Sequence, residues 1–188
     1  MKKFIFVISG LVIIAVLFMA CEELKSADDI TFNAKFSADL NANAPTAEQY
    51  KLSIEDTTFV ISSEDEVIDP RSNSDFKRYA DKIRNVGVES VDGKILSINP
   101  DTVTLVTANI GVVTDDASTG WSFDNETIYK NKELTFDNSG GQWDIINDML
   151  ENMEEFTVSL DGEVDNENVV FELRITINTK VTADALGK

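Results

Sequence analysis

Apolar and polar residues alternate with a period of two along most of the chain after residue 29, and this pattern limits the fold more than any other feature. Ile30, Phe32 and Phe36 alternate with polar residues, which is typical of a strand with one face in a core. Near the end of the chain the same alternation covers Val169, Phe171, Leu173, Ile175, Ile177, Thr179 and Val181. No strand–helix–strand rhythm repeats, so the pattern favours antiparallel strands.

Two Asp-Gly pairs predict tight turns between strands. Asp92-Gly93 separates the strand-like stretches 88–91 and 94–98, and it predicts a two-residue hairpin. Asp161-Gly162 predicts a turn before the long final strand. Residues 102–114 are rich in Val, Thr and Ile and predict a further long strand.

Two segments have helical periodicity. The first follows Ser72 or Ser74, either of which fits the N-cap position, and it should end at Gly87. Its apolar face consists of Phe76, Tyr79, Ala80, Ile83 and Val86. The second begins at a capping box formed by Ser139 and Gln142. Its apolar face consists of Trp143, Ile146, Met149, Leu150 and Met153.

Short polar turns join about eight predicted strands, and with the two short helices they indicate a mostly β protein. We predict a single antiparallel β-sandwich, Ig-like in outline, whose helices plug its ends or cover an edge. A β-barrel is the alternative.

The residue types that are missing exclude several classes of function. The chain has no His and one Cys, which excludes serine triads, Cys–His dyads, His-ligated zinc and an internal disulfide. The formal net charge of −18 argues against nucleic-acid binding, which needs a basic surface. The G-x-S-x-G, P-loop and G-x-G-x-x-G motifs are absent from the sequence as well. We therefore expect neither an enzyme nor a nucleic-acid partner.

The N-terminus has the parts of a secretory signal. Lys2 and Lys3 precede an uncharged apolar run over 4–20, which is followed by Cys21. The run is short for a transmembrane helix, although an uncleaved membrane anchor is the alternative. The segment Leu17-Phe-Met-Ala-Cys21 resembles the lipobox of bacterial lipoproteins. It departs from the strict pattern two and three positions before the Cys, in a relaxed form similar to that of Bacteroidota-type lipoproteins.

The resemblance implies that Cys21 becomes the mature N-terminus and carries a covalent diacylglycerol and an N-acyl chain. It divides the chain into a lipoprotein signal peptide over 1–20, a lipidated tether over 21–27 and a single β-sandwich domain over 28–188. Because the protein is acidic, acyl chains rather than a basic patch would hold it to the membrane. Glu22 favours the outer membrane, while the leaflet and the surface exposure stay open.

A second segment, 75–91, resembles one that recurs in small uncharacterised Bacteroidota-type lipoproteins with β-sandwich domains. It implies no known activity or site. From the two resemblances we expect a lipid-anchored protein of the cell envelope with a non-enzymatic structural or protein-interaction role. Its partner would be the membrane together with an unknown envelope protein or glycan. The alternative is a glycan- or calcium-binding surface lipoprotein.

One candidate site for a glycan surrounds a tryptophan. An exposed Trp beside carboxylates and amides suits the stacking and hydrogen bonding of a sugar ring, and Trp121 lies near Asp115, Asp116, Asp124 and Asn125. The opposing interpretation makes Trp121 a core residue at the beginning of a strand, with acids in the flanking loop.

A candidate site for calcium has acids at every second position, namely Asp161, Glu163, Asp165 and Glu167. Calcium takes about six to eight oxygen ligands, and a turn with this spacing could aim several carboxylates inward. The EF-hand pattern is absent from the sequence, and the alternative is a solvated turn on an acidic protein. Apart from this calcium and the chains on Cys21, we expect no cofactor.

Overall fold

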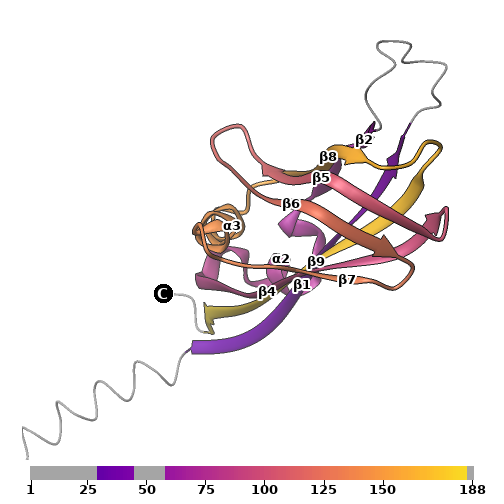
Figure 1. The fold of residues 1–188 in the computed structure, drawn as a ribbon. Coiled ribbons are helices and arrows are strands. Elements are labelled where there is room, and N and C mark those ends of the chain that lie inside the picture. The colour runs from indigo at the N-terminus through magenta and orange to yellow at the C-terminus, as the bar shows by residue number, and fades with distance from the viewer. Residues whose placement is uncertain (1–28, 45–57, 186–188) are drawn as a thin grey trace, which may run out of the picture.

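The computed structural model describes residues 29–44 and 58–185 of the chain (Figure 1). The predicted signal peptide, Cys21 and the tether lie outside these residues. The elements, in chain order, are β1 (Asp29–Asn43), β2 (Phe59–Ser63), β3 (Glu66–Ile68), the 3₁₀-helix η1 (Pro70–Ser72), α2 (Ser74–Tyr79), the 3₁₀-helix η2 (Ala80–Lys82), β4 (Ile83–Asn99), β5 (Thr102–Val113), β6 (Ser118–Tyr129), β7 (Glu133–Phe136), α3 (Gln142–Glu151), β8 (Phe156–Val164) and β9 (Val170–Asp184).

The nine described strands form one antiparallel sheet in the order β6-β5-β8-β2-β1-β9-β4-β7, with β3 paired to β8. The sheet curls until it is nearly closed (Figure 1). The turn after β6 reaches across to β4, where the Ile95 N–H donates to the Lys132 carbonyl at 3.0 Å and the Asn131 N–H donates to the Ile95 carbonyl at 2.8 Å. The prediction of a mostly β, antiparallel architecture with two short helices is confirmed. The strands form a single barrel-like sheet.

The predicted alternation in the first and last strands is confirmed. β1 and β9 pair along their whole length, from Asp29 opposite Asp184 to Asn43 opposite Val170. On both strands every second side chain points into the core, as Phe36 at 4% exposure and Leu173 at 1% illustrate. The largest fully buried side chains include Phe76, Phe136, Phe156 and Phe171. The core therefore fills the inside of the curled sheet.

The first predicted helix is real but much shorter than expected. Neither Ser72 nor Ser74 is its N-cap, because the Asn73 side chain accepts hydrogen bonds from the N–H groups of Asp75 and Phe76, both at 3.1 Å. α2 ends at Tyr79, and the chain enters β4 at residue 83 rather than continuing to Gly87. The β-branched residues after α2 pair with β9, and this pairing outweighs their helical spacing.

The second predicted helix is confirmed, but its predicted capping box is wrong. Ser139 turns back to Asp137, whose carboxylate accepts from both its N–H and its hydroxyl. α3 begins after Gly141, and the Asn138 side chain accepts from the Trp143 N–H at 2.8 Å. The helix buries Ile146, Met149 and Leu150.

The helix α3 covers an edge of the sheet. β7 pairs only with residues 91–94 of β4, so the earlier part of that strand has no neighbouring strand on this side. There the Val88 N–H donates to Asn147 Oδ1 at 2.8 Å, and the Val86 N–H donates to Glu151 Oε1 at 2.6 Å. Side chains of α3 thus take the place of a strand at an edge that would otherwise present free backbone groups.

The predicted hairpin at Asp92-Gly93 is wrong, because β4 runs straight through both residues. A Cβ atom on Gly93 would lie 2.8 Å from a ring carbon of Phe136. The glycine therefore makes room inside a strand for an aromatic ring from the neighbouring strand, and no turn is needed to explain it.

Within the described residues, no helix has the length and apolar character needed to cross a membrane.

Candidate functional site

Trp121, the centre of the candidate glycan site, lies inside the sheet. Its side chain is 8% exposed, and its indole N–H donates to the Asp137 carbonyl at 2.7 Å. Its ring centroid lies 5.0 Å from that of Phe136. An indole held in this way has no open face on which a sugar ring could stack.

The acids predicted to surround Trp121 are not gathered around it. Asp115 and Asp116 lie in the turn between β5 and β6, whereas Asp124 pairs with Thr107 well along the same hairpin. Asn125 follows with a φ of 54°, in the left-handed region. The structure therefore splits the predicted group between the tip and the body of the hairpin.

The four acids of the candidate calcium site do not lie in one turn. β8 runs through Asp161 and Glu163, and the predicted turn at Asp161-Gly162 is therefore wrong. A Cβ atom on Gly162 would collide with the Thr107 carbonyl oxygen. This glycine permits a close approach of β8 to the irregular part of β5.

Two of these acids are engaged by the protein itself. Asp161 Oδ2 accepts from the Asn109 side chain at 3.1 Å, and Asp165 Oδ1 accepts from the Thr104 N–H at 2.9 Å. Glu167 is exposed in the turn before β9. In the part of the chain that the structure describes, no group of three or more acidic or Cys side chains could hold a metal ion.

One broad surface feature lies on the outer face of the sheet. It is a hollow of about 780 Å³, which we call the β3–β8–β5 hollow. It is lined by Asp65, Val67, Arg71, Val113, Thr114, Asp115, Asp116, Asn152, Met153, Glu154, Glu155, Thr157 and Ser159. Three connections form its walls: the turn before β3, the turn between β5 and β6, and the segment between α3 and β8.

Part of the lining is a row of side chains across three strands. Val67 on β3 and Val113 on β5 both lie opposite Thr157 on β8. Both valines are large apolar side chains left in solvent, at 61% and 44% exposure. Thr157 and Ser159 carry hydroxyl groups on the same outer face of β8.

The hollow was missed by reasoning from the sequence, although a signal for it exists. Val67 precedes Ile68, and Val113 follows Val112. In each pair a strand of period two can bury only one member, so the other must face outward. The carboxylates on the walls come from separate turns, and no linear motif joins them.

Outside the hollow, the charged groups with shifted pKa values form local surface contacts. Arg174 donates two hydrogen bonds to Asp39, at 2.6 Å from Nε and 2.7 Å from Nη2, and these lower the pKa of Asp39. Lys132 contacts Glu126 at 2.8 Å, and the hydrogen bond raises the pKa of Lys132.

Neither protein-family models nor curated proteins match the chain. Solved structures do match, and three of them cover most of its length. The decameric BFDV capsid protein is 4% identical, with 81% of this chain and 99% of that chain covered and a TM-score of 0.42. A chain of Desmodium yellow mottle tymovirus is 10% identical, with 84% and 90% covered and a TM-score of 0.35. A chain of the semi-empty virus-like particle of Macrobrachium rosenbergii nodavirus is 6% identical, with 83% and 94% covered and a TM-score of 0.34.

These comparisons correct the resemblance drawn from the sequence. The three structures are a viral capsid protein and chains of a virus and of a virus-like particle, and small Bacteroidota-type lipoproteins are not among them. The function drawn from that resemblance, a lipid-anchored cell-envelope protein or a glycan- or calcium-binding surface lipoprotein, is therefore withdrawn. At these identities and TM-scores no residue, ligand or assembly carries over to this chain. Acylation of Cys21 and the outer-membrane location concern residues outside the described part and stay predictions.

Proposed function

We propose that this chain is a non-enzymatic structural protein. The observation that carries the proposal is the filled, apolar interior of the sheet. Among the described residues that are buried, the polar or charged ones are Thr179 and Asp184. The Thr179 hydroxyl donates to the Ala34 carbonyl at 3.1 Å, and Asp184 accepts from Arg84 at 2.9 Å. Both side chains thus join neighbouring strands, which supports a scaffold rather than a reaction chamber.

The ends of β1 and β9 support the same role. Asp29 and Asp184 lie opposite each other, and two carboxylates at such a position repel. Arg84 on β4 contacts both, at 2.9 Å in each case. One guanidinium therefore joins three neighbouring strands at the end of the β1–β9 pair, and this charge network serves the shape of the domain.

The proposal is tested by looking for turnover at the β3–β8–β5 hollow, where paired carboxylates could in principle hydrolyse a bound substrate. The full chain is purified in non-ionic detergent and incubated with chromogenic esters, phosphoesters and glycosides. We expect rates equal to those of buffer for the wild type. We expect the same for a variant with Asp115→Asn and Asp116→Asn, which removes two carboxylates from an exposed turn.

A rate above buffer that this variant loses would overturn the structural role, because it would place chemistry at the hollow. The variant also serves as its own folding control. Both residues are exposed and do not pack in the core. The urea unfolding midpoint of the variant should therefore match that of the wild type.

A further inference from the structure

The outer face of a sheet in contact with water is normally polar, and the β3–β8–β5 hollow breaks this rule. Val67 and Val113 flank Thr157 on adjacent strands, which places the two side chains about 10 Å apart at ordinary strand spacing. Both line the hollow and keep 61% and 44% exposure. Exposed apolar side chains in a hollow that is rimmed by polar groups are typical of a docking surface.

The rim of this hollow is strongly negative. Five of the lining residues carry carboxylates and one, Arg71, carries a guanidinium. The carboxylates are Asp65, Asp115, Asp116, Glu154 and Glu155. In the described part of the chain, none of these five takes part in an ion pair. Like charges gathered around one concavity repel, and a cationic occupant would relieve that repulsion.

The spacing of the carboxylates limits the size of the cation that could occupy the hollow. They come from three separate connections, and no three of the described acids are close enough to share a metal ion. An occupant must therefore carry several positive charges over a length comparable to the hollow. It must also present apolar groups to the two valines, which a simple polyamine does not do.

We propose that the β3–β8–β5 hollow docks a basic, extended peptide segment of a partner protein. Apolar side chains of the segment cover Val67 and Val113, and Lys or Arg side chains on either side of them reach the carboxylates of the rim. This inference rests on the proposed structural role, since it names the kind of partner that the scaffold holds. A second copy of the chain does not fit, because its net charge of −18 repels the same rim.

The test uses a labelled octapeptide of alternating Lys and Val, acetylated and amidated, and the full chain in non-ionic detergent. Fluorescence anisotropy measures the dissociation constant. We expect binding that weakens at least tenfold between 20 and 200 mM NaCl, on the order expected when screening removes several charge contacts. The counterpart octapeptide of Glu and Val should not bind.

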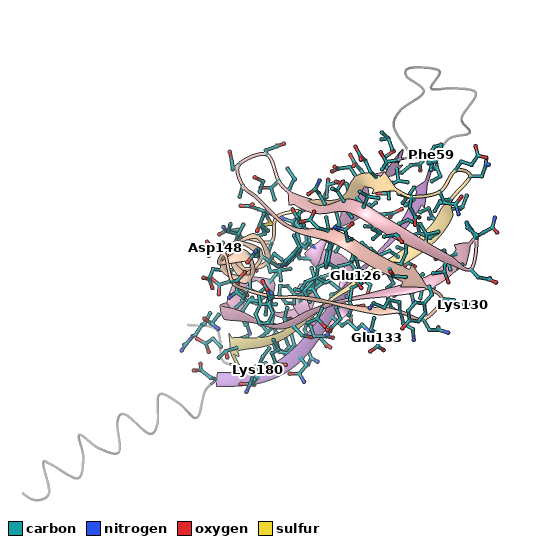
Figure 2. The ribbon with its side chains drawn as sticks, viewed as in Figure 1. Phe59, Glu126, Lys130, Glu133, Asp148 and Lys180 are labelled. Atoms are coloured by element: carbon teal, nitrogen blue, oxygen red, sulfur yellow. The ribbon has the colours of Figure 1, made fainter. Side chains whose placement is uncertain are left out.

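Matched variants place the binding site. Asp115→Asn with Asp116→Asn removes two charges from the rim, and we expect at least a tenfold loss of affinity. Asp124→Asn with Glu133→Gln removes two charges from exposed positions outside the hollow. Glu133 is the first residue of β7, and Figure 2 shows it well away from Asp148 on α3. We expect the affinity of this control to change less than twofold.

The apolar part of the proposal needs its own variant. Val67→Thr with Val113→Thr keeps the shape and the β-branch of both side chains while making them polar, and we expect at least a threefold loss of affinity. Equal losses from the rim variant and the distant control would overturn the inference, because binding would then follow net charge alone. So would equal binding of the acidic octapeptide. Each of these experiments measures peptide binding alone, so its outcome is independent of the turnover experiment.

Discussion

On the inner face of β9, alternate side chains such as Phe171 and Ile177 are at most 1% exposed and pack in the core. On the outer face of the same strand, Arg174 forms an ion pair with Asp39, with about two fifths of each side chain still in solvent. The two faces come from the same stretch of sequence, yet different interactions stabilise them. Burial of apolar surface stabilises by about 25 cal/mol per Å², whereas an exposed ion pair contributes about 0–1 kcal/mol.

This difference separates stability from recognition. The inner face can change little without loss of the fold, because its side chains are close-packed. Polar side chains on the outer face can be substituted at a small cost in stability, and the β3–β8–β5 hollow lies on this face. Four predictions test how sharp this division is, and they are ordered by the expected change in the free energy of unfolding.

The largest effect is expected from Phe136→Ala on the inner face of β7. The side chain is fully buried, and its ring contacts those of Trp121 and Phe123, with centroids 5.0 and 5.4 Å away. Truncation leaves a cavity, and we expect a loss of about 3–5 kcal/mol in urea unfolding. Thr135→Ala, at the exposed neighbouring position, should change stability by less than about 0.5 kcal/mol. Similar losses from the two variants would erase the distinction between the faces.

The second prediction concerns Gly93 on β4, which lies beneath the ring of Phe136. Gly93→Ala overpacks this contact, and we expect a loss of about 1–3 kcal/mol. In a Phe136→Leu background the added methyl group meets a smaller side chain, so the same substitution should cost less. A double-mutant cycle measures the difference as a coupling of at least about 0.5 kcal/mol. Strict additivity would show that the glycine serves some purpose other than making room for the ring.

The same glycine shows what could be predicted from the sequence and what could not. The period of two in residues 30–38 and 169–181 depends only on local alternation, so β1 and β9 and their buried faces were predicted correctly. Asp-Gly pairs are ambiguous, because a glycine can serve a tight turn or a close approach between strands. Gly93 and Gly162 both serve close approaches, and the deciding neighbours lie far away in sequence.

The candidate site divides in a similar way. The acidity and the exposed valines of the hollow are present in the sequence, but their convergence depends on the order of β3, β8 and β5 in the sheet. Residues 65, 115 and 154 come together only because β3 and β5 both pair with β8. The residues predicted around Trp121 are spread along the hairpin for the opposite reason, because residues close in sequence need not be close in space.

An intermediate effect is expected at the edge of β4 that α3 covers. Asn147→Ala removes the acceptor of the Val88 N–H, and we expect a loss of about 1 kcal/mol, typical of one hydrogen bond at a partly buried site. Asp148, labelled on α3 in Figure 2, is exposed, and Asp148→Ala changes the same helix without touching the sheet. Its unfolding free energy should stay within about 0.5 kcal/mol of the wild type.

Hydrogen exchange at Val88 sharpens this comparison, because the amide should exchange faster in Asn147→Ala than in Asp148→Ala. Equal exchange rates in the two variants would contradict the view that α3 replaces a strand at this edge, since the N–H would then be protected by packing alone.

The smallest effect is expected on the outer face, at the ion pair between Asp39 and Arg174. Hydrogen bonds from Arg174 lower the pKa of Asp39 below its ordinary value of 3.8, so the folded state favours the charged carboxylate. The pair therefore stabilises the protein above that ordinary value, and its contribution is lost as the pH falls through the lowered pKa. Asp39→Asn should lower the unfolding free energy at pH 6 by no more than about 1 kcal/mol, because both side chains are well exposed.

The acid limb of the stability curve decides whether this small effect is electrostatic. With urea unfolding at pH 6 and again in acid below the lowered pKa, the gap between wild type and Asp39→Asn should close, because Asp39 is then neutral in both the folded and unfolded states. A gap of the same size in acid would mean that the carboxylate acts through packing or shape. The outer face would then share the kind of interaction that holds the inner face, and the contrast between them would be one of degree.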